Sequence, residues 1–451
     1  MNPLQQYIDL YREHRGLIDA NGADPLNRMR ADACRALEGC TLAPRGSDLF
    51  KNIDLGQLLA PDFGINLDRV NIDVNPADTF RCDVPVLAAP LMLCINDTPT
   101  PTDHAALPEG VEFCSLRTWA LDNPHEAEHF YGRLASLGNP LVALNTLLCQ
   151  DGVLLRVRKG VRLERPLQIV QILSHAMPMM AVRRLIVIVE DGADASLIVC
   201  DHSQRKDIDY LALQTVEVFV GTDARLSLCG LEESTETTTR LASFYIDQGA
   251  RSEVTVNAIT LFNGTTRNEF FCRFSGEEAR LRLYGMGIED GKRTLSNYSL
   301  IEHNVPRCNS DELFKYSVDG EATAAFAGRI YVAPGAIGTE AYQSNRNLLA
   351  SDTAKVYTQP VLEIYNDDVK CSHGAAIGQL DELQLFYMRT RGISEETARL
   401  MLRQAFMSDV INSVQSPALR DRLHLLVERR FAGADSACAS CRNCNPDNTL
   451  D

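Results

Sequence analysis

The 451-residue sequence lacks any uninterrupted apolar stretch long enough to cross a bilayer, and its first twenty residues lack the continuous apolar core of a signal peptide. These absences speak against a membrane protein and against secretion, so we expect a cytoplasmic location. The sequence also lacks long runs of Lys or Arg, with 44 basic against 60 acidic residues and a net charge of -16. That balance argues against a nucleic-acid partner or an anionic membrane surface.

Nucleotide-binding and hydrolase motifs are missing as well. The nearest approach to a phosphate loop starts at Gly285, but its glycine spacing is wrong, and Arg293 stands where Ser or Thr would hold magnesium. Neither a Gly-x-Ser-x-Gly elbow nor a His-Glu-x-x-His helix is present. We therefore expect no nucleotide site and no enzyme of these classes.

A convincing helical pattern is absent between Pro178 and Gly378. Val142–Asn145 and Leu167–Leu173 are strand-like, and Leu185–Val189 is fully apolar, as in a buried strand. Parallel sheets of the βαβ type need helical crossovers, so this pattern excludes that architecture and predicts a mainly β fold.

A weak repeat runs through this region, each copy holding two strands and two turns. Its template is a glycine, two variable residues, a small residue, a polar residue and an aliphatic residue. The copies begin at Gly192, Gly221, Gly249, Gly276 and, after a longer gap, Gly320. Stacked coils place equivalent positions in ladders where a bulky residue has no room. The pattern favours a parallel β-helix, with a sandwich of hairpins as the alternative.

Helical regions flank the β repeat. We divide the chain into an N-terminal helical and irregular region (1–105), a β-helix core (106–378), a C-terminal helical domain (379–433) and a loose cysteine-rich tail (434–451). Helical spacing links Leu4, Tyr7, Ile8 and Tyr11; Asp24 is expected to cap a helix that runs through Leu37 to Gly39. The first C-terminal helix is expected from Leu380 to Met388. A second should begin after Ser394 and carry the apolar stripe Met401, Leu402, Ala405, Phe406, Val410 and Val414. A third should begin after Ser416, with Leu419, Leu423, Leu426 and Val427 on one face.

Cys371 and His373 form the main candidate site, at the junction between the strands and the C-terminal helices. Two residues apart on a strand, they point to the same face and can address one ligand together. The alternative is a cysteine packed in the sheet and a histidine bonded to a carbonyl group.

A second cysteine group, Cys438, Cys441 and Cys444, has the spacing of an iron–sulfur motif, but the fourth cysteine and its proline are not in place. These thiolates need a fourth ligand from elsewhere to hold a metal. Their alternative role is as exposed, redox-sensitive thiols. The other cysteines among the 14 are scattered singly, and we expect them to be reduced core residues.

Several segments carry a family resemblance. They are Ala143–Asn145 with Gln150–Val153 and Arg165-Pro166, His303–Ser310, Phe326–Ile330, Asn347–Leu349, Val369–Gly374 with Gly378, and Leu385–Gly392. With these segments the chain resembles the SufD subunits, the non-ATPase scaffolds of the SUF iron–sulfur cluster assembly machine. The sister SufB subunits typically carry Glu where this chain has Gly374, so SufD is the closer match.

The resemblance implies a right-handed parallel β-helix between helical ends, and a scaffold without catalytic residues. It implies pairing of the β-helix edge with SufB, or with a second copy when SufB is absent, and docking of the SufC ATPase through the C-terminal helices. His373, with Cys371 beside it, then faces the site of a nascent, transiently held cluster; some such complexes also carry a flavin. For the docking surface we expect Leu385, Phe386, Tyr387, Arg389, Arg391, Met401 and Phe406.

A different functional class stays open from the residues alone. β-Helices also serve as carbohydrate-active enzymes or binding proteins, which need clustered carboxylates on one face. Asp191, Asp194 and Asp223 lie beside turn glycines, where Asp is common for backbone reasons.

Overall fold

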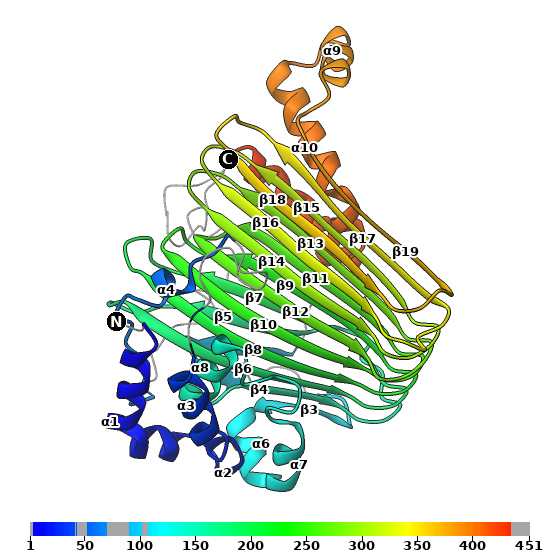
Figure 1. Cartoon of the computed structure of the whole chain (residues 1–451). Coiled ribbons are helices and arrows are strands. Elements are labelled where there is room, and N and C mark those ends of the chain that lie inside the picture. Colours follow the sequence, from blue (N-terminus) through cyan, green and yellow to red (C-terminus); the bar gives the residue numbers. More distant parts are fainter. Residues whose placement is uncertain (1–2, 41, 43–51, 70–89, 102–106, 434–451) are drawn as a thin grey trace.

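A parallel β-solenoid forms the body of the protein. The computed structural model describes residues 3–40, 42, 52–69, 90–101 and 107–433. Strands β4 to β19 alternate between two sheets, which gives eight turns of two strands each (Figure 1). Helices lie at the N-terminal end and along one face. The structure confirms the predicted mainly β fold with helical flanks.

The described residues form one sheet of ten strands and one of nine. In spatial order, the first contains β19 (Val369–Gly378), β17 (Thr339–Leu349), β15 (Asn309–Val318), β13 (Arg280–Glu289), β11 (Glu253–Phe262), β9 (Arg225–Glu233), β7 (Asp194–Ser203), β5 (Leu167–Leu173), β1 (Leu91–Ile95) and β2 (Thr98–Pro101). The second contains β18 (Lys355–Ile364), β16 (Thr323–Val332), β14 (Thr294–His303), β12 (Thr265–Phe274), β10 (Thr238–Gln248), β8 (Tyr210–Val220), β6 (Met179–Val189), β4 (Val153–Val157) and β3 (Val111–Ser115).

Neighbouring strands in each sheet are parallel and in register over most of their length; β10, for example, pairs with β8 and β12 without a slip. In the part of the chain that the structure describes, antiparallel pairing is confined to β1–β2 and β3–β4, at the N-terminal end. A sandwich of hairpins requires antiparallel neighbours throughout, so the parallel ladders exclude that alternative.

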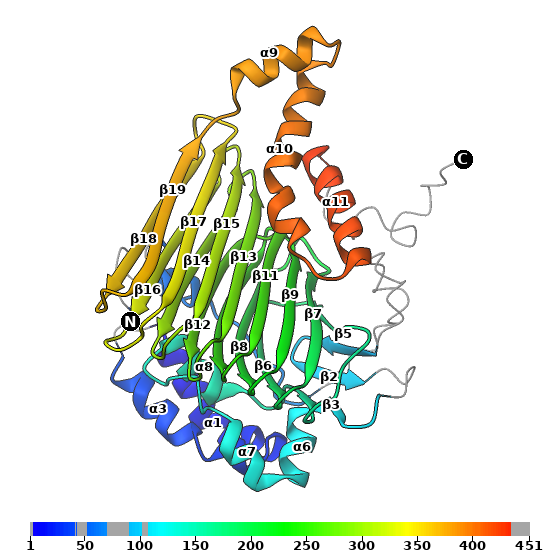
Figure 2. The same cartoon turned by 90° about the vertical axis from the view of Figure 1, so that its right-hand side faces the viewer.

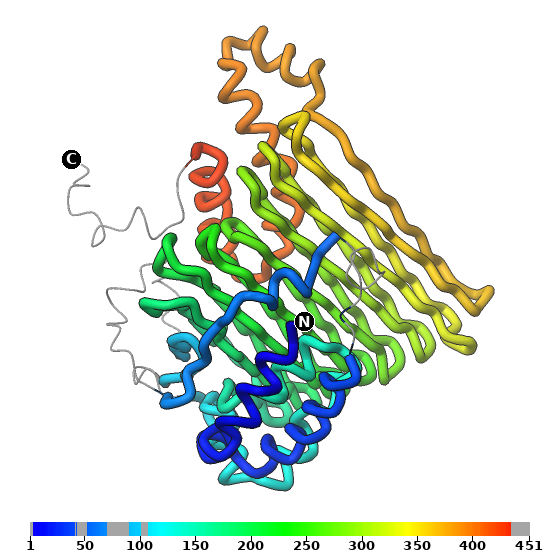
Figure 3. Tube along the Cα trace, turned by 60° about the vertical axis from the view of Figure 1, so that its left-hand side comes forward, coloured from blue at the N-terminus to red at the C-terminus, as the bar shows by residue number. Residues whose placement is uncertain are grey.

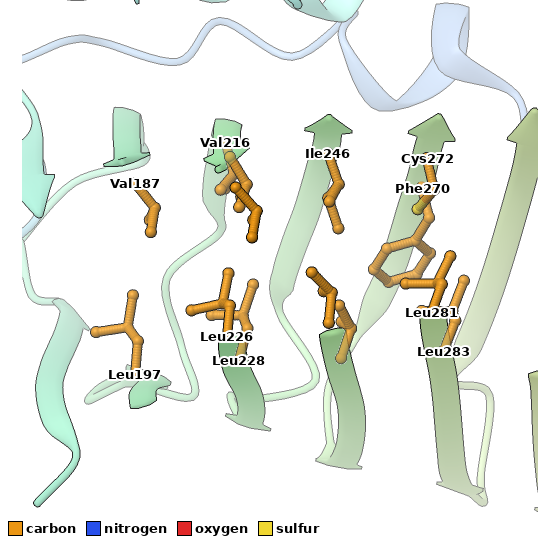
Figure 4. Packing of buried hydrophobic residues seen from close by; sticks show 14 of the residues in the cluster. Val187, Leu197, Val216, Leu226, Leu228, Ile246, Phe270, Cys272, Leu281 and Leu283 are labelled. Atoms are coloured by element: carbon orange, nitrogen blue, oxygen red, sulfur yellow. The ribbon is translucent and has the colours of Figure 1, made fainter. Parts of the chain in front are cut away.

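The interior of the solenoid is filled by every second residue of both sheets, as strand alternation requires. Val216 and Phe270 from the nine-stranded sheet meet Leu226 and Leu283 from the ten-stranded sheet between the layers (Figure 4). Each such apolar side chain stabilises the fold by roughly 1.5–3 kcal/mol when fully buried. A single coil cannot bury its apolar side, and stacking makes the core continuous.

The turns that lead into the ten-stranded sheet form a regular ladder. One residue in each has a positive φ, and its N–H donates to a carbonyl of the following turn; these residues are Gly192, Asp223, Arg251, Glu278, Arg307 and Gly338. A small buried residue follows the first five of them, namely Ala193, Ala224, Ser252, Ala279 and Cys308. The small-residue ladder expected from the repeat is therefore present.

Two copies of the predicted repeat were misaligned. Leu226 lies opposite Ala195 rather than Leu197, so the copy at Gly192 is shifted by two residues. Gly320 lies in the opposite row of turns, leading into β16 of the nine-stranded sheet, and packs on Gly291. Spacing along the chain does not distinguish the two rows, because both hold glycine-rich turns with nearly the same period.

The N-terminal helices gather over the first coils of the solenoid (Figure 3). They are α1 (Gln5–Asn21), α2 (Asp24–Asn27), α3 (Arg30–Glu38), α4 (Leu55–Leu58), α6 (Leu116–Asp122), α7 (Pro124–Phe130) and α8 (Pro140–Leu148). The predicted stripe of α1 is buried. The helix expected from Asp24 to Leu37 is instead two helices, α2 and α3, and Ala23 rather than Asp24 precedes the first. Gly39 ends α3, as predicted.

The strand predicted at Val142–Asn145 is wrong, because these residues belong to α8. Asn139 accepts a hydrogen bond from the Leu141 N–H and Pro140 occupies the first turn, which together start a helix. All nine residues of α8 are buried, Asn145 and Thr146 included, so the helix has no exposed polar face and shows no amphipathic period. β1 and β2 also lie in the region expected to be helical and irregular, and β1 extends the ten-stranded sheet.

The C-terminal helices are α9 (Glu382–Thr390), α10 (Glu395–Asn412) and α11 (Pro417–Phe431). The second half of α10 and α11 cover the outer face of the ten-stranded sheet, and α9 projects beyond the sheet (Figure 2). The predicted apolar residues of α11 are buried. Val410 and Val414 of α10 are also buried, but Met401 is exposed because the first half of the helix extends past the sheet. No helix in the described ranges is long and apolar enough to span a membrane.

Toward its last coils the solenoid interior contains buried carboxyl groups. Glu289 of β13 and Glu312 of β15 are fully buried. Burial raises the pKa of Glu289 to about 8 and that of Glu312 to about 7. Both carboxyls therefore favour the neutral form inside the solenoid.

Gly276 tests the close approach of the turns. A Cβ at this position would lie 2.0 Å from the backbone nitrogen of Ala250 in the preceding turn. We expect Gly276→Ala to destabilise the protein by about 2 kcal/mol, because the backbone of one turn must move. Urea denaturation checks this, with Gly230→Ala as the control, since a Cβ there meets only an ordinary contact at 3.8 Å. Equal stability of the two variants would contradict the close stacking.

The buried carboxyls predict a pH dependence. Because the pKa of Glu312 is raised from its ordinary value of 4.5 to about 7, its stabilising effect is complete below pH 4.5 and is lost as the pH rises through 7. Glu312→Gln should flatten the fall in unfolding free energy between pH 5 and 7 by up to about 1.4 kcal/mol per pH unit. Urea denaturation at several pH values measures the slope, and Glu321→Gln at an exposed turn is the control. An unchanged slope in Glu312→Gln would show that this carboxyl titrates normally.

Candidate functional site

The last coil of the solenoid is open. β18 and β19 stand at the ends of their sheets and pair only with β16 and β17, so one backbone edge of each has no described strand beside it. Large apolar side chains are exposed on or beside this coil, namely Tyr342, Tyr357, Ile364, Tyr365 and Ile377. An unpaired strand edge with exposed apolar residues is a surface for pairing with another chain.

Cys371 and His373 both lie on β19, in this open coil. Their register partners on β17 are Ala341 and Gln343, which are buried inside the solenoid. Because paired residues of parallel strands point to the same face, the two side chains share the face toward the solenoid axis. Cys371 is half-buried against the core cluster, whereas His373 is exposed. The structure thus brings the two candidate ligands together.

The chemistry of the two groups differs. Burial raises the pKa of the Cys371 thiol, although a hydrogen bond from the Ala341 N–H opposes the rise. The thiol is therefore mostly protonated at neutral pH and becomes a ligand only when a metal displaces its proton. No hydrogen bond from the described residues holds the His373 ring, so its two nitrogens are available to a ligand.

The described residues do not complete a metal site by themselves. Nowhere in the described ranges do three or more His, Cys, Asp or Glu side chains gather as a metal site would require. Cys371 and His373 supply at most two ligands, whereas an iron or zinc site in a protein typically has four. Any metal at this coil needs ligands beyond those that the described residues supply.

The remaining cysteines fall into two groups, those outside the described residues and those within them. Cys438, Cys441 and Cys444 lie outside the described residues, so their metal-binding role stays a prediction. The ten cysteines in the described ranges are free thiols, six of them buried. Burial raises the pKa of Cys149, for example, to about 11, as expected for inert core thiols.

The predicted docking residues separate into exposed and covered groups. Phe386 and Tyr387 of α9 are 67% and 58% exposed, and the side chains of Arg389 and Arg391 are also exposed. Leu385 is buried. Phe406 packs on the solenoid, where the Lys315 ammonium bonds to its carbonyl oxygen at 2.8 Å.

Sequence reasoning missed Leu383, which is 78% exposed. With Phe386 and Tyr387 it has the i, i+3, i+4 spacing of one helix face, a signal that was present in the sequence. We name the exposed apolar residues of the two helices, Leu383, Phe386 and Tyr387 of α9 with Met401 in the first half of α10, the α9 apolar surface.

The segment that resembles a phosphate loop and the aspartates beside the turn glycines have structural roles. Gly285 to Arg293 runs from β13 through a turn into β14, with no helix N-terminus to bind phosphate. The Asp191 carboxylate accepts the N–H of Thr222, and Asp223 forms an ion pair with Arg251. These aspartates organise turns, and no carbohydrate site is needed to account for them.

Glu312 and Gln343, in the two coils before His373, were also missed. Alternation shows that such positions face the interior, but it does not show that a polar pair occupies them. A Glu and a Gln at inward positions of otherwise regular strands were the available signal.

Comparison with known proteins identifies the family. The family model described as "SUF system FeS cluster assembly, SufBD core domain" matches residues 172–406, and the model described as "SufBD protein N-terminal region" matches residues 1–169. The chain is 26% identical over 442 residues to an iron–sulfur cluster assembly SufBD family protein of Synechocystis sp., covering 95% of this chain and 94% of that one.

Two further relatives are similar over shorter stretches. The iron–sulfur cluster assembly protein SufD of Escherichia coli is 34% identical over 177 residues, which are 39% of this chain and 42% of that protein. The chloroplastic protein ABCI7 of Arabidopsis thaliana is 29% identical over 334 residues, which are 72% and 70% of the two chains. The chain is therefore a SufD-like member of the SufBD family of the SUF iron–sulfur cluster assembly system.

Proposed function

We propose that this chain is the SufD-type scaffold subunit of a SUF complex, and that it acts by pairing its open coil with a SufB-type solenoid. The observation that carries this proposal is the last coil, where β18 and β19 each expose an unpaired edge and His373 stands at that edge. A second solenoid supplies the missing strand partners and covers the exposed apolar residues.

Pairing with a second solenoid also supplies further ligands for a metal. An incoming SufB-type edge strand brings its own side chains beside His373 and Cys371, so ligands from both chains converge on a cluster that is cargo rather than a resident cofactor. A scaffold role needs no catalytic residue in this chain. The flavin associated with some such complexes stays a prediction.

The proposal includes docking of the SufC ATPase on the α9 apolar surface. This surface lies beyond the sheet edge on a projecting helical arm (Figure 2). Large exposed apolar side chains on a projecting helix are suited to a groove in a partner protein. Since the arm follows β19 directly, a change in the ATPase can act on the strand that carries His373.

When the paired subunit is absent, a second copy of this chain can occupy the same edge. The carbohydrate-binding alternative is not proposed, because two of its three candidate aspartates, Asp191 and Asp223, are engaged in turn contacts.

His373 tests the site. We expect His373→Ala to leave the co-expressed three-subunit complex intact but to lower iron and sulfide per complex after reconstitution by about tenfold, because a ligand at the paired edge is lost. Ser372→Ala, on the opposite face of the same strand, is the matched control. Unchanged iron and sulfide in His373→Ala would overturn the site, and loss of the complex would show that His373 supports pairing instead.

The docking surface has its own test. Replacing Leu383 and Phe386 together by Ala should weaken co-purification of the ATPase subunit at least tenfold while the paired solenoid is retained, because the most exposed apolar contacts are removed. Leu425→Ala on α11, with 38% exposure, is the control for loss of an ordinary surface leucine. Full retention of the ATPase by the double variant would place its docking site elsewhere.

A further inference from the structure

The two coils that precede His373 in the solenoid each contribute one side chain to a buried polar pair, and these two side chains are hydrogen-bonded to each other. Gln343 of β17 is the register partner of His373, and Glu312 of β15 is the register partner of Gln343. The Gln343 Nε2 group donates a hydrogen bond to the Glu312 Oε2 atom at 2.6 Å, and the two side chains are 3% and 0% exposed. Three successive coils thus align a carboxyl, an amide and an imidazole in one column toward the open end.

The opposite sheet makes room for this column. Gly328 of β16 has no side chain, and a Cβ there would lie 2.3 Å from the Gln343 Nε2 atom and 2.9 Å from the Ser299 Oγ atom. The neighbouring inward positions of the same strand hold Phe326 and Ile330, which are buried and apolar. The absence of a side chain at Gly328 therefore leaves space for polar groups within an otherwise apolar part of the interior.

Two oxygen atoms of the column, Glu312 Oε1 and Gln343 Oε1, form no hydrogen bond with the described residues. The Gln343 Oε1 atom is buried and forms no hydrogen bond with the described residues. The bond to Glu312 directs the amide NH2 group away from His373, which orients the amide. A buried acceptor left unpaired lowers the stability of the fold, so a donor beside it stabilises the arrangement. The next inward residue of the column is His373, whose imidazole carries such a donor.

We propose that Glu312 and Gln343 are positioning residues for His373: the Gln343 Oε1 atom accepts a hydrogen bond from one ring N–H, and the other ring nitrogen is left free to bind iron at the paired edge. This inference rests on the ligand role proposed for His373. Histidine ligands commonly donate their second N–H to an oxygen atom, which sets the tautomer and the direction of the ring. Here the acceptor is itself held by a carboxyl one coil deeper.

The tautomer of the His373 ring is a direct measure of this proposed hydrogen bond. In the full-length chain labelled with 15N-histidine, at pH 8, we expect His373 to populate one neutral tautomer; the resonance is assigned by its loss in His373→Ala. Gln343→Met, which removes the acceptor at similar volume, should give a mixture of both tautomers. Tyr342→Phe on the outer face of the same strand is the control and should retain one tautomer.

The wild-type spectrum is decisive even if Gln343→Met fails to fold, because a tautomer mixture at His373 in the wild type overturns the inference. An unchanged single tautomer in folded Gln343→Met also overturns it. In the complex, Gln343→Met should lower the initial rate of cluster formation about tenfold. If the tautomer responds as expected but His373→Ala leaves cluster formation unchanged, the ligand role fails while the positioning contact stands.

Discussion

In-register stacking of parallel strands is the constraint on which this protein depends. A coil of two strands satisfies neither its backbone hydrogen bonds nor its apolar face, and each coil obtains both from the next one. At each end of such a stack, the terminal coil has a neighbouring coil on one side only. The first end is closed by the antiparallel strands β2 and β3 and by the N-terminal helices. The last end, β18 with β19, is left open, so the same hydrogen bonding that builds the fold creates its surface for association.

Polar side chains occur along the interior of the solenoid, in the earlier coils as well as near its open end. The earlier coils hold Arg183, Asp201 and Arg240, which are joined by ion pairs, and the later coils hold Glu289, Glu312 and Gln343. Buried polar groups cost stability unless they are paired, and Gln343 and Glu312, next to the open coil, are hydrogen-bonded to each other. Gly328 leaves room for Gln343, since a Cβ there would lie 2.3 Å from the Gln343 Nε2 atom. These features join the interior of the solenoid to the chemistry of its edge through His373.

The helical arm connects the open coil to a second surface. α10 and α11 are held on the outer face of the ten-stranded sheet, where Arg430 bonds to the Leu261 carbonyl at 2.7 Å. That attachment holds α9 beyond the sheet, with its apolar residues exposed. β19 continues into α9 through only Gln379, Leu380 and Asp381. The edge and the α9 apolar surface are therefore different ends of one continuous segment, which suits a scaffold that contacts two partners.

The sequence by itself determined the fold class, the small-residue ladder and the shared face of Cys371 and His373, because these follow from strand alternation and a period near 28 residues, which are local properties. It misassigned α8, since a helix buried on all sides has no amphipathic period. Spacing along the chain also failed to separate the two rows of turns, as Gly320 shows. The family resemblance already implied an exposed edge at the end of the β-helix. Only the tertiary structure decided that Leu385 is covered while Leu383 is exposed, and that Glu312 and Gln343 lie behind His373. These features depend on which coil lies beside which, a long-range relation that no local pattern of residues encodes.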